Sequence, residues 1–337
     1  MDAERSFELM AFKLFGHQYR NNRHYRRLCD GEHVGPETLR SWRDIPAMPA
    51  EAFKAFTLTA FPVKKAVRVF RTSGTTGEKR GAHYFETLSL YDSLSMPVFA
   101  EYLLPDKAKL SYFFLVESPA RAKDSSLSYM MGLVNRHFGG GRGNYYVKRG
   151  RLLSDKLIRD LKTAKGPVFI LSTAFSLAAF LDELKKKNVR LKLKKGSRLM
   201  ETGGFKGRVK EVSKKTLYAA CERYLGIPRG RCAGEYGMTE LTGQFYETTL
   251  IRPGKKPVFQ GPPWMRTMII DPATGHEVKK GRTGLLRIFD LTNVGSVMAV
   301  QTQDLARETG GGFILLGRAP RSELRGCSLS YERLLRL

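Results

Sequence analysis

Cysteine is scarce in this sequence, and its four copies stand far apart: Cys29, Cys221, Cys232 and Cys327. No two of them form a Cys-x-x-Cys pair, and the six histidines do not cluster beside them. These absences exclude a disulfide framework and the usual ligand spacing of a zinc site. We expect Cys29, Cys221 and Cys232 to be small buried hydrophobic residues.

The chain also lacks long apolar stretches. No run approaches the roughly 18 consecutive apolar residues that identify a transmembrane helix. The N-terminus, Met1 to Arg5, lacks the apolar core of a signal peptide, so we expect a cytoplasmic protein. With 337 residues, of which 42% are hydrophobic, the chain is long enough for two lobes or one large α/β unit.

Acidic residues are few, because 32 Asp and Glu stand against 58 Lys and Arg, for a formal net charge of +26. Such an excess favours acidic partners: nucleic acid, a membrane surface or an acidic carrier protein. The positive charge is densest in residues 185–215, most of which we interpret as a solvated surface. No recognisable nucleic-acid-binding module accompanies it, and aromatic residues do not alternate with the basic ones, so nucleic acid is not the expected partner.

Apolar patterning predicts strands that alternate with helices over most of the chain, which is typical of parallel βαβ units. The first helix covers residues 3–28, with an inner face of Phe7, Met10, Leu14 and Phe15. The predicted strands are 67–70, 110–116, 168–172 and 197–200, and the helices after them are 86–104, 125–138, 173–187 and 209–224.

Two further features complete the predicted fold. In the helix over residues 173–187 we expect the inward side chains to be Phe175, Ala178, Ala179, Leu181 and Leu184. From residue 264 on the pattern changes to strands with few helices, at 265–270, 284–289, 296–301 and 313–316. These strands predict a small, mostly antiparallel β subdomain beside the α/β part.

A loop rich in glycine and hydroxyl side chains follows the strand 67–70: Thr72, Ser73, Gly74, Thr75, Thr76 and Gly77, with Lys79 and Arg80 after it. Glycines allow positive φ, so successive N–H groups can point into one concavity that binds phosphate oxygens. The GxxxxGK[ST] spacing of a P-loop is absent. By itself the loop is equally consistent with phosphate binding and with a flexible hairpin turn.

Three more elements follow apparent strands further along the chain, and ligand sites in open α/β sheets lie at the carboxyl ends of strands. They are Gly203-Gly204-Phe205; Tyr236-Gly237-Met238-Thr239-Glu240; and Asp304 with Arg318. In this order the four elements resemble the motifs of the adenylate-forming superfamily of acyl-CoA synthetases, adenylation domains and luciferases. The resemblance covers about two-thirds of the chain and implies an α/β adenylate-forming N-terminal lobe.

The segments around Gly203, Arg318 and Cys327 resemble more narrowly the acyl-protein synthetases of the bacterial luciferase system, which are long-chain-fatty-acid–protein ligases. The superfamily's C-terminal domain, with its assisting lysine, has no counterpart here, and we expect it to be absent. We expect an N-terminal helical cap, nucleotide- and acyl-binding subdomains, a small β subdomain and a hinge-like tail, over residues 1–60, 61–262, 263–317 and 318–337.

The resemblance implies that ATP and Mg²⁺ activate a carboxylic acid, expected to be fatty, as an acyl-AMP. Residues 72–77 would bind ATP, with Thr75 and Thr76 over the β- and γ-phosphates, and Arg80 at the rim would be a further catalytic residue. Gly203, Gly204, Phe205, Tyr236 and Gly237 would contact the nucleotide, and Asp304 and Arg318 its ribose. Thr239 would donate to the α-phosphate, and Glu240 would hold Mg²⁺, a cation that prefers carboxylate and phosphate oxygens.

The resemblance also gives Cys327 the role of acyl acceptor, before an acceptor protein such as a reductase or an acidic carrier protein. Four alternatives stay open at this point. The chain could be a non-catalytic nucleotide-binding protein, or it could transfer the acyl group to coenzyme A. From the residues alone, Thr239 and Glu240 could simply cap a helix, and Cys327 could be inert.

Overall fold

The computed structural model describes residues 2–73, 79–203 and 213–320, and the chain divides into two compact units. Unit 1 consists of residues 1–94, 238–244 and 260–337. Unit 2 consists of residues 95–237 and 245–259. The predicted boundaries at residues 60, 262 and 317 stay a prediction.

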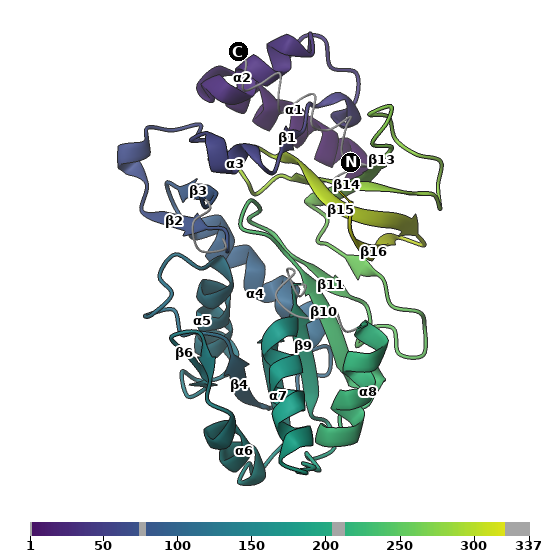
Figure 1. Ribbon diagram of the computed structural model, residues 1–337. Coiled ribbons are helices and arrows are strands. Elements are labelled where there is room, and N and C mark those ends of the chain that lie inside the picture. The colour runs from purple at the N-terminus through teal and green to yellow at the C-terminus, as the bar shows by residue number, and fades with distance from the viewer. Residues whose placement is uncertain (1, 74–78, 204–212, 321–337) are drawn as a thin grey trace. The chain divides into compact units, whose positions relative to one another are not determined.

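Unit 2 is built on a mostly parallel sheet with the order β11-β10-β9-β8-β4-β5 (Figure 1). All neighbours from β10 to β5 are parallel, and the short β11 pairs with β10 in the antiparallel direction. The strands are β4 (Ser111–Leu115), β5 (Asn144–Tyr145), β8 (Val168–Thr173), β9 (Arg198–Thr202), β10 (Cys232–Tyr236) and β11 (Phe245–Glu247), with β12 (Phe259–Gln260) next to β11 and a small hairpin of β6 (Val147–Lys148) and β7 (Arg151–Leu152).

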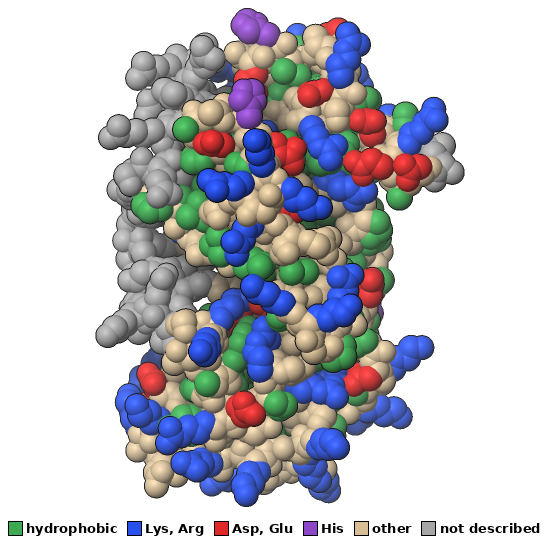
Figure 2. Space-filling model, turned by 90° about the vertical axis from the view of Figure 1, so that its right-hand side faces the viewer, with side chains coloured by type: hydrophobic (Ala, Val, Ile, Leu, Met, Phe, Trp, Pro, Cys, Tyr) green, Lys and Arg blue, Asp and Glu red, His purple; other side chains and the backbone are tan. Residues whose placement is uncertain are grey.

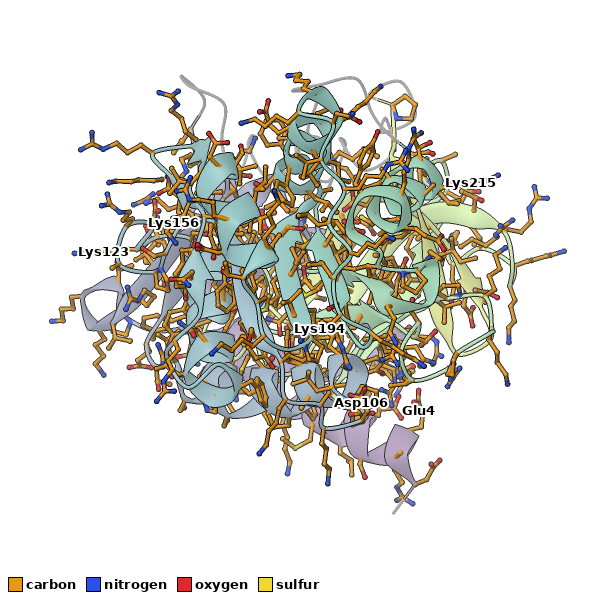
Figure 3. All side chains as sticks on the ribbon, turned by 90° about the horizontal axis from the view of Figure 1, so that it is seen from below. Glu4, Asp106, Lys123, Lys156, Lys194 and Lys215 are labelled. Atoms are coloured by element: carbon orange, nitrogen blue, oxygen red, sulfur yellow. The ribbon has the colours of Figure 1, made fainter. Side chains whose placement is uncertain are left out.

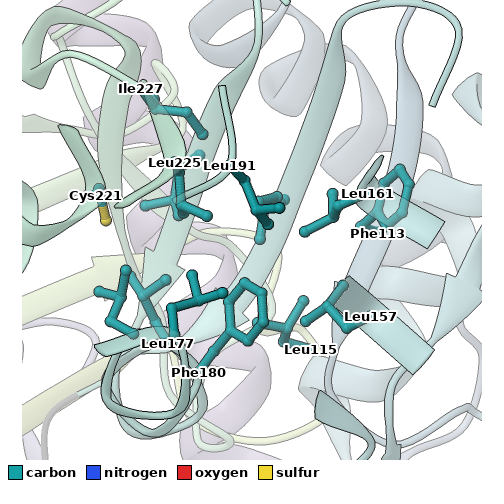
Figure 4. Close-up of a cluster of buried hydrophobic side chains, with 14 of the residues drawn as sticks. Phe113, Leu115, Leu157, Leu161, Leu177, Phe180, Leu191, Cys221, Leu225 and Ile227 are labelled. Carbon is teal, nitrogen blue, oxygen red and sulfur yellow. The ribbon is translucent and has the colours of Figure 1, made fainter. Parts of the chain in front are cut away.

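Helices cover both faces of this sheet, as expected when parallel strands are joined by crossover connections. Leucines and Cys221 of three helices pack with strand residues in one buried cluster (Figure 4). On the other face Phe99 lies 5.9 Å from Phe169 and 6.1 Å from Tyr246, ring centroid to centroid. The helices are α4 (Ser89–Leu103), α5 (Ser126–Phe138), α6 (Ser154–Lys162), α7 (Ala174–Lys186) and α8 (Lys214–Leu225).

Unit 1 contains an antiparallel sheet in the order β13-β14-β15-β16, with the short β1 parallel to β15. The N-terminal helices pack on this sheet, since the Trp42 ring contacts both Phe7 of α1 and Phe289 of β14. Its elements are α1 (Ala3–Asn21), α2 (Arg23–Gly31), β1 (Met48–Pro49), α3 (Ala52–Ala55), a hairpin of β2 (Arg68–Arg71) and β3 (Ala82–Phe85), β13 (Met265–Ile270), β14 (Thr283–Asp290), β15 (Ala299–Thr309) and β16 (Gly312–Arg318), with 3₁₀ turns at Trp42–Asp44, Val63–Lys65 and, in unit 2, Arg229–Arg231.

Most predicted elements are confirmed to within a few residues, but the strand predicted at residues 296–301 is β15, which begins at residue 299 and continues to residue 309. The single helix predicted over residues 3–28 is wrong, because the chain turns at Asn22. The side chain of Asn22 accepts from the Tyr25 N–H and so caps the second helix, α2. The predicted start of the helix 209–224 lies in part outside the described residues, and Ser213 caps its visible part.

Two predicted core positions are also wrong. Met10 on α1 is 55% exposed and Phe175 on α7 is 39% exposed. In α7 the buried side chains include Leu177 and Phe180, which lie one helical turn before Leu181 and Leu184 on the same face, whereas Phe175 faces outward. Of the other predicted inward residues, Ala178 and Ala179 are half-buried, whereas Phe7, Leu14, Phe15, Leu181 and Leu184 are buried, as are Cys29, Cys221 and Cys232.

The amino end of β9 is held by a buried cation. Arg198 is 1% exposed, and its guanidinium donates to Asp106 at 2.6 Å and to the Leu103 carbonyl at 2.8 Å. Asp106 lies at this end of unit 2 (Figure 3), and hydrogen bonding to Arg198 lowers its pKa to about 2. Within the described ranges, no helix is both long and apolar enough to cross a membrane.

Candidate functional site

The glycine-rich loop emerges from the β2–β3 hairpin of unit 1, and its base is closed by hydrogen bonds. The Thr72 N–H donates to the Gly81 carbonyl at 2.9 Å, and the Gly81 N–H donates to the Thr72 hydroxyl at 2.8 Å. A Cβ at position 81 would lie 3.0 Å from the Thr72 methyl group, so glycine suits this close approach. The predicted phosphate loop therefore begins and ends at a fixed base.

Arg80 belongs to the same base. Its Nε donates to the Thr72 carbonyl at 2.5 Å and its Nη2 to the Arg71 carbonyl at 3.2 Å. The guanidinium is thus engaged with the hairpin backbone. Arg80 has the geometry of a residue that braces the loop, and a direct catalytic role for it stays a prediction.

Gly203, Tyr236 and Gly237 come together in unit 2, at the carboxyl ends of two adjacent parallel strands. The register pairs Thr202 of β9 with Glu235 of β10, and the predicted nucleotide-binding residues follow directly. Gly203 has a φ of +74°, a conformation that favours glycine. This is the sheet edge at which ligands bind in open α/β folds.

Thr239 and Glu240 lie in a turn that belongs to unit 1. The Leu241 N–H donates to the Met238 carbonyl at 3.1 Å, and no helix follows, so the alternative of a simple helix cap is wrong. The Nδ1 atom of His83 lies 2.8 Å from the Thr239 carbonyl, and the Asn293 amide donates to the Glu240 carbonyl at 2.9 Å. Side chains from two distant segments therefore hold this turn.

Asp304 and Arg318 lie opposite one another on β15 and β16, with Arg318 Nε 3.5 Å from Asp304 Oδ1. Arg318 is largely exposed, whereas Asp304 is 21% exposed, so the pair is accessible from solvent. Glu51 lies within reach of their charges, and burial raises the pKa of its carboxyl despite the nearby Arg318. The structure thus brings together the two residues predicted to contact the ribose.

A buried acid in unit 2 escaped the sequence analysis. Glu235 is 6% exposed, and its carboxylate accepts a short hydrogen bond from the Thr202 hydroxyl. Burial raises the pKa of Glu235 to about 7, with a smaller contribution from the Glu201 carboxylate on the neighbouring strand. A carboxyl that is partly protonated at neutral pH can donate as well as accept a hydrogen bond.

Several predicted site residues lie outside the described part of the chain: Gly74, Thr75, Thr76, Gly77, Gly204, Phe205 and Cys327. Among the residues that the structure does describe, no group of three or more His, Cys, Asp or Glu side chains is placed to hold a metal ion. Glu240 can still contribute to a Mg²⁺ site, because Mg²⁺ is commonly held by one or two carboxylates together with substrate phosphates.

Sequence reasoning also missed His83 and Asn293. Both are nearly fully buried, at 2% and 1% exposure, and both contact the backbone of the Thr239–Glu240 turn. Neither belongs to a recognisable motif, and His83 lies 156 positions from Thr239 in the sequence. One signal could have indicated His83: it lies two residues after Gly81, on a strand whose residues are mostly buried.

Comparison with known proteins gives consistent findings. The family model "Acyl-protein synthetase, LuxE" matches residues 2–335. A phenylacetate-coenzyme A ligase from Aromatoleum evansii is 27% identical over 311 residues, which are 86% of this chain and 63% of the ligase. A long-chain-fatty-acid–luciferin-component ligase from Vibrio harveyi is 22% identical over 342 residues, with 95% of this chain and 85% of that protein covered.

Among solved structures, an open conformation of 2-hydroxyisobutyryl-CoA ligase in complex with 2-HIB-AMP and CoA superposes with a TM-score of 0.67. The match covers 94% of this chain and 69% of the ligase at 14% identity, which shows a common fold. The α/β lobe of adenylate-forming type that the sequence predicted is thereby confirmed.

Proposed function

Because the chain belongs to the acyl-protein synthetase family, LuxE, we propose that it is an adenylate-forming ligase that activates a carboxylic acid with ATP. A carboxylate oxygen attacks the α-phosphorus of ATP, the bond to the β-phosphate oxygen breaks, and pyrophosphate leaves. The product is an acyl-AMP. A thiolate then attacks the acyl carbon, a thioester forms and AMP leaves.

The observation that carries this proposal is the grouping of motif residues within unit 1. The base of the glycine-rich loop, the Thr239–Glu240 turn and the Asp304–Arg318 pair all belong to that unit, and His83 joins the first two. Adenylation depends on positioning and on charge stabilisation more than on a covalent group from the protein. A fixed loop base and a held turn meet that need.

Most of the predicted site residues have a role in this proposal. Residues 72–77 would bind the β- and γ-phosphates, Thr239 the α-phosphate, and Asp304 with Arg318 the ribose. The Glu240 carboxylate would hold Mg²⁺ together with phosphate oxygens. When bound, Mg²⁺ neutralises charge on the phosphates. Gly203, Tyr236 and Gly237 would also contact the nucleotide.

We propose a fatty acid as the substrate, Cys327 as the first acyl acceptor and an acceptor protein as the second. The Vibrio harveyi relative, whose name states a long-chain fatty acid, supports the substrate class. The other three cysteines are buried, with 0% exposure each. Burial raises the pKa of the Cys29 thiol well above the usual range, and the hydrogen bond with Cys232, together with burial, does the same for the Cys221 thiol. Such thiols are poor nucleophiles. The basic surface supports an acidic acceptor.

The test is acid-dependent exchange of labelled pyrophosphate into ATP, with Mg²⁺ and a panel of fatty and aromatic acids. We expect exchange with fatty acids, and a loss of roughly 100-fold or more in Glu240→Ala because a charge-stabilising group is removed. The exposed acid Glu222 on α8 provides the control, and Glu222→Ala should exchange at the wild-type rate.

Exchange that is absent with every acid, in folded protein that binds ATP, would contradict the proposal and favour a non-catalytic nucleotide-binding protein. Thioester formation on added coenzyme A at the rate of exchange would instead favour a coenzyme A ligase. The relationship to phenylacetate-coenzyme A ligase makes that outcome the second candidate.

A further inference from the structure

The turn that carries Thr239 and Glu240 has no helix or strand of its own to fix it. Residues 237–244 lie outside regular secondary structure between β10 and β11. A turn of this kind relies on side chains from other segments to keep one conformation. A displacement of about 1 Å in a catalytic group can lower a rate about 100-fold, so whatever holds this turn bears on the chemistry.

Two buried side chains hold two consecutive carbonyl groups of the turn. His83 Nδ1 lies 2.8 Å from the Thr239 carbonyl oxygen, and Asn293 Nδ2 lies 2.9 Å from the Glu240 carbonyl oxygen. Asn293 is held in turn by donation to the Val297 carbonyl at 2.8 Å and by the Thr242 hydroxyl, which donates to its Oδ1 at 2.8 Å.

His83 differs from Asn293 in where it comes from. It lies on β3. Ala82 of β3 pairs with Arg71 of β2, and this is the last pair of the hairpin before the glycine-rich loop. Its ring packs against Phe85, 4.2 Å between centroids, and against Phe53 at 5.8 Å. The imidazole therefore joins the hairpin that presents the loop to the turn that presents Thr239.

The contact fixes the tautomer of the ring. A carbonyl oxygen only accepts, so Nδ1 must carry the hydrogen. Burial lowers the pKa of His83 to about 4, so the ring is neutral at neutral pH with Nε2 unprotonated. A neutral, packed ring of fixed tautomer is suited to holding a backbone group rather than to transferring a proton.

We propose that His83 is a positioning residue, whose Nδ1–H holds the Thr239 carbonyl and couples the phosphate-loop hairpin to the Thr239–Glu240 turn. The inference rests on the proposed function for its kinetic consequence. The coupling makes the placement of Thr239 depend on the hairpin. Removal of the hydrogen bond should therefore slow the chemical step while leaving the affinity for the acid nearly unchanged.

A matched pair of variants isolates the hydrogen bond. In His83→Asn the amide nitrogen hangs from Cγ, as Nδ1 does, and can still donate to the Thr239 carbonyl. In His83→Gln the amide nitrogen is one bond further out, near the place of Nε2. Both variants lose the ring contacts with Phe53 and Phe85, so a comparison between them cancels that loss.

We expect His83→Gln to lower kcat for pyrophosphate exchange about 10- to 100-fold, with the KM for the acid within about threefold of wild type. His83→Asn should recover at least about tenfold of that loss. His137 provides the control, because its Nδ1 also lies near a backbone carbonyl, that of Leu133 at 3.0 Å on α5. His137→Gln and His137→Asn should both match the wild type.

A second measurement tests the role of His83 without relying on enzyme activity. Hydrogen exchange followed by mass spectrometry should show faster exchange in the peptide covering residues 238–244 for His83→Gln than for His83→Asn. If wild type catalyses no pyrophosphate exchange, the proposed function fails, but this difference still tests the coupling. Equal protection of residues 238–244 in the two variants, or equal kcat in an active enzyme, would overturn the role of His83.

Discussion

Glu235 is a single residue that should make the stability of the protein depend on pH, although no sequence motif indicates this. Its carboxyl is buried at the end of β10, next to the predicted nucleotide-binding residue Tyr236. The Thr202 hydroxyl donates to it, which favours the charged form, but burial has the larger effect and raises the pKa to about 7. The usual value of 4.5 applies to the unfolded chain.

The sign of the resulting stability change follows from these two pKa values. Below about pH 4.5 the carboxyl is protonated in both states. Between pH 4.5 and 7 the unfolded chain loses the proton while the folded chain keeps it, so stability falls as the pH rises through this window. Above about pH 7 the folded protein carries a buried charge. The free energy of unfolding should fall by about 3 kcal/mol across this window, since one pKa unit corresponds to about 1.36 kcal/mol.

We therefore predict that Glu235→Gln raises the free energy of unfolding, relative to wild type at the same pH, by more at pH 8 than at pH 5. Urea unfolding at the two pH values measures the free energy of unfolding for each protein. The exposed Glu222 supplies the matched control, Glu222→Gln, which should leave the pH dependence unchanged. If the stability difference between Glu235→Gln and wild type is the same at pH 5 and pH 8, the carboxyl is not held protonated by the fold.

At the scale of elements, the loop between β14 and β15 organises the inside of unit 1. Gln18 of α1, which is fully buried, donates to the Asn293 carbonyl at 2.8 Å and accepts from the Met298 N–H at 2.9 Å. Asp290, at the end of β14, accepts from the N–H groups of Thr242 and Gly243 at 3.0 and 2.7 Å. The loop thus ties the N-terminal helix to the segment that follows Glu240.

Asp290→Ala should lower the free energy of unfolding by roughly 3 kcal/mol, because buried N–H groups at positions 242, 243 and 292 lose their acceptor. Asp290→Asn keeps one acceptor oxygen, so it should lower the free energy of unfolding by less. Chemical denaturation measures both, and Asp182→Ala on the exposed face of α7 is the control. A loss below about 0.5 kcal/mol for Asp290→Ala, the range of ordinary surface substitutions, would show that water replaces the carboxylate.

At the scale of the whole molecule, charge and chemistry are distributed unevenly along the chain. The residues 185–195 contain seven basic side chains and no acidic one, and they belong to unit 2. Figure 2 shows Lys and Arg side chains spread over the face that it draws, and Lys156 and Lys215 lie on the outside of unit 2 in Figure 3. The Asp304–Arg318 pair and the Thr239–Glu240 turn belong to unit 1.

The two half-reactions should separate in Cys327→Ser. Adenylation needs the phosphate loop, Thr239 and Glu240, whereas thioester formation needs a thiolate. We predict nearly unchanged pyrophosphate exchange and no hydroxylamine-sensitive labelling by a radioactive fatty acid. The neighbouring substitution Ser328→Ala should retain both activities. Labelling of Cys327→Ser at the wild-type rate and with the same hydroxylamine sensitivity would show that Cys327 is not the acceptor.

The local elements and the order of the motifs follow from the amino-acid sequence alone. The apolar run at residues 168–171 forms a buried strand, and Ser125 and Thr173 cap helices through hydrogen bonds to residues three positions away. Periodicity failed where a helix offered apolar residues on more than one face, as it did for Phe175 on α7.

The residues that support the candidate site are set by contacts between distant segments of the folded chain. His83 and Thr239 are 156 residues apart, and Asn293 and Glu240 are 53 apart. Their hydrogen bonds join a strand or loop to a turn that no local pattern specifies. Likewise the raised pKa of Glu235 arises from what surrounds its carboxyl in the fold. Burial and long-range hydrogen bonds are properties of three-dimensional packing, and local sequence periodicity contains no record of them.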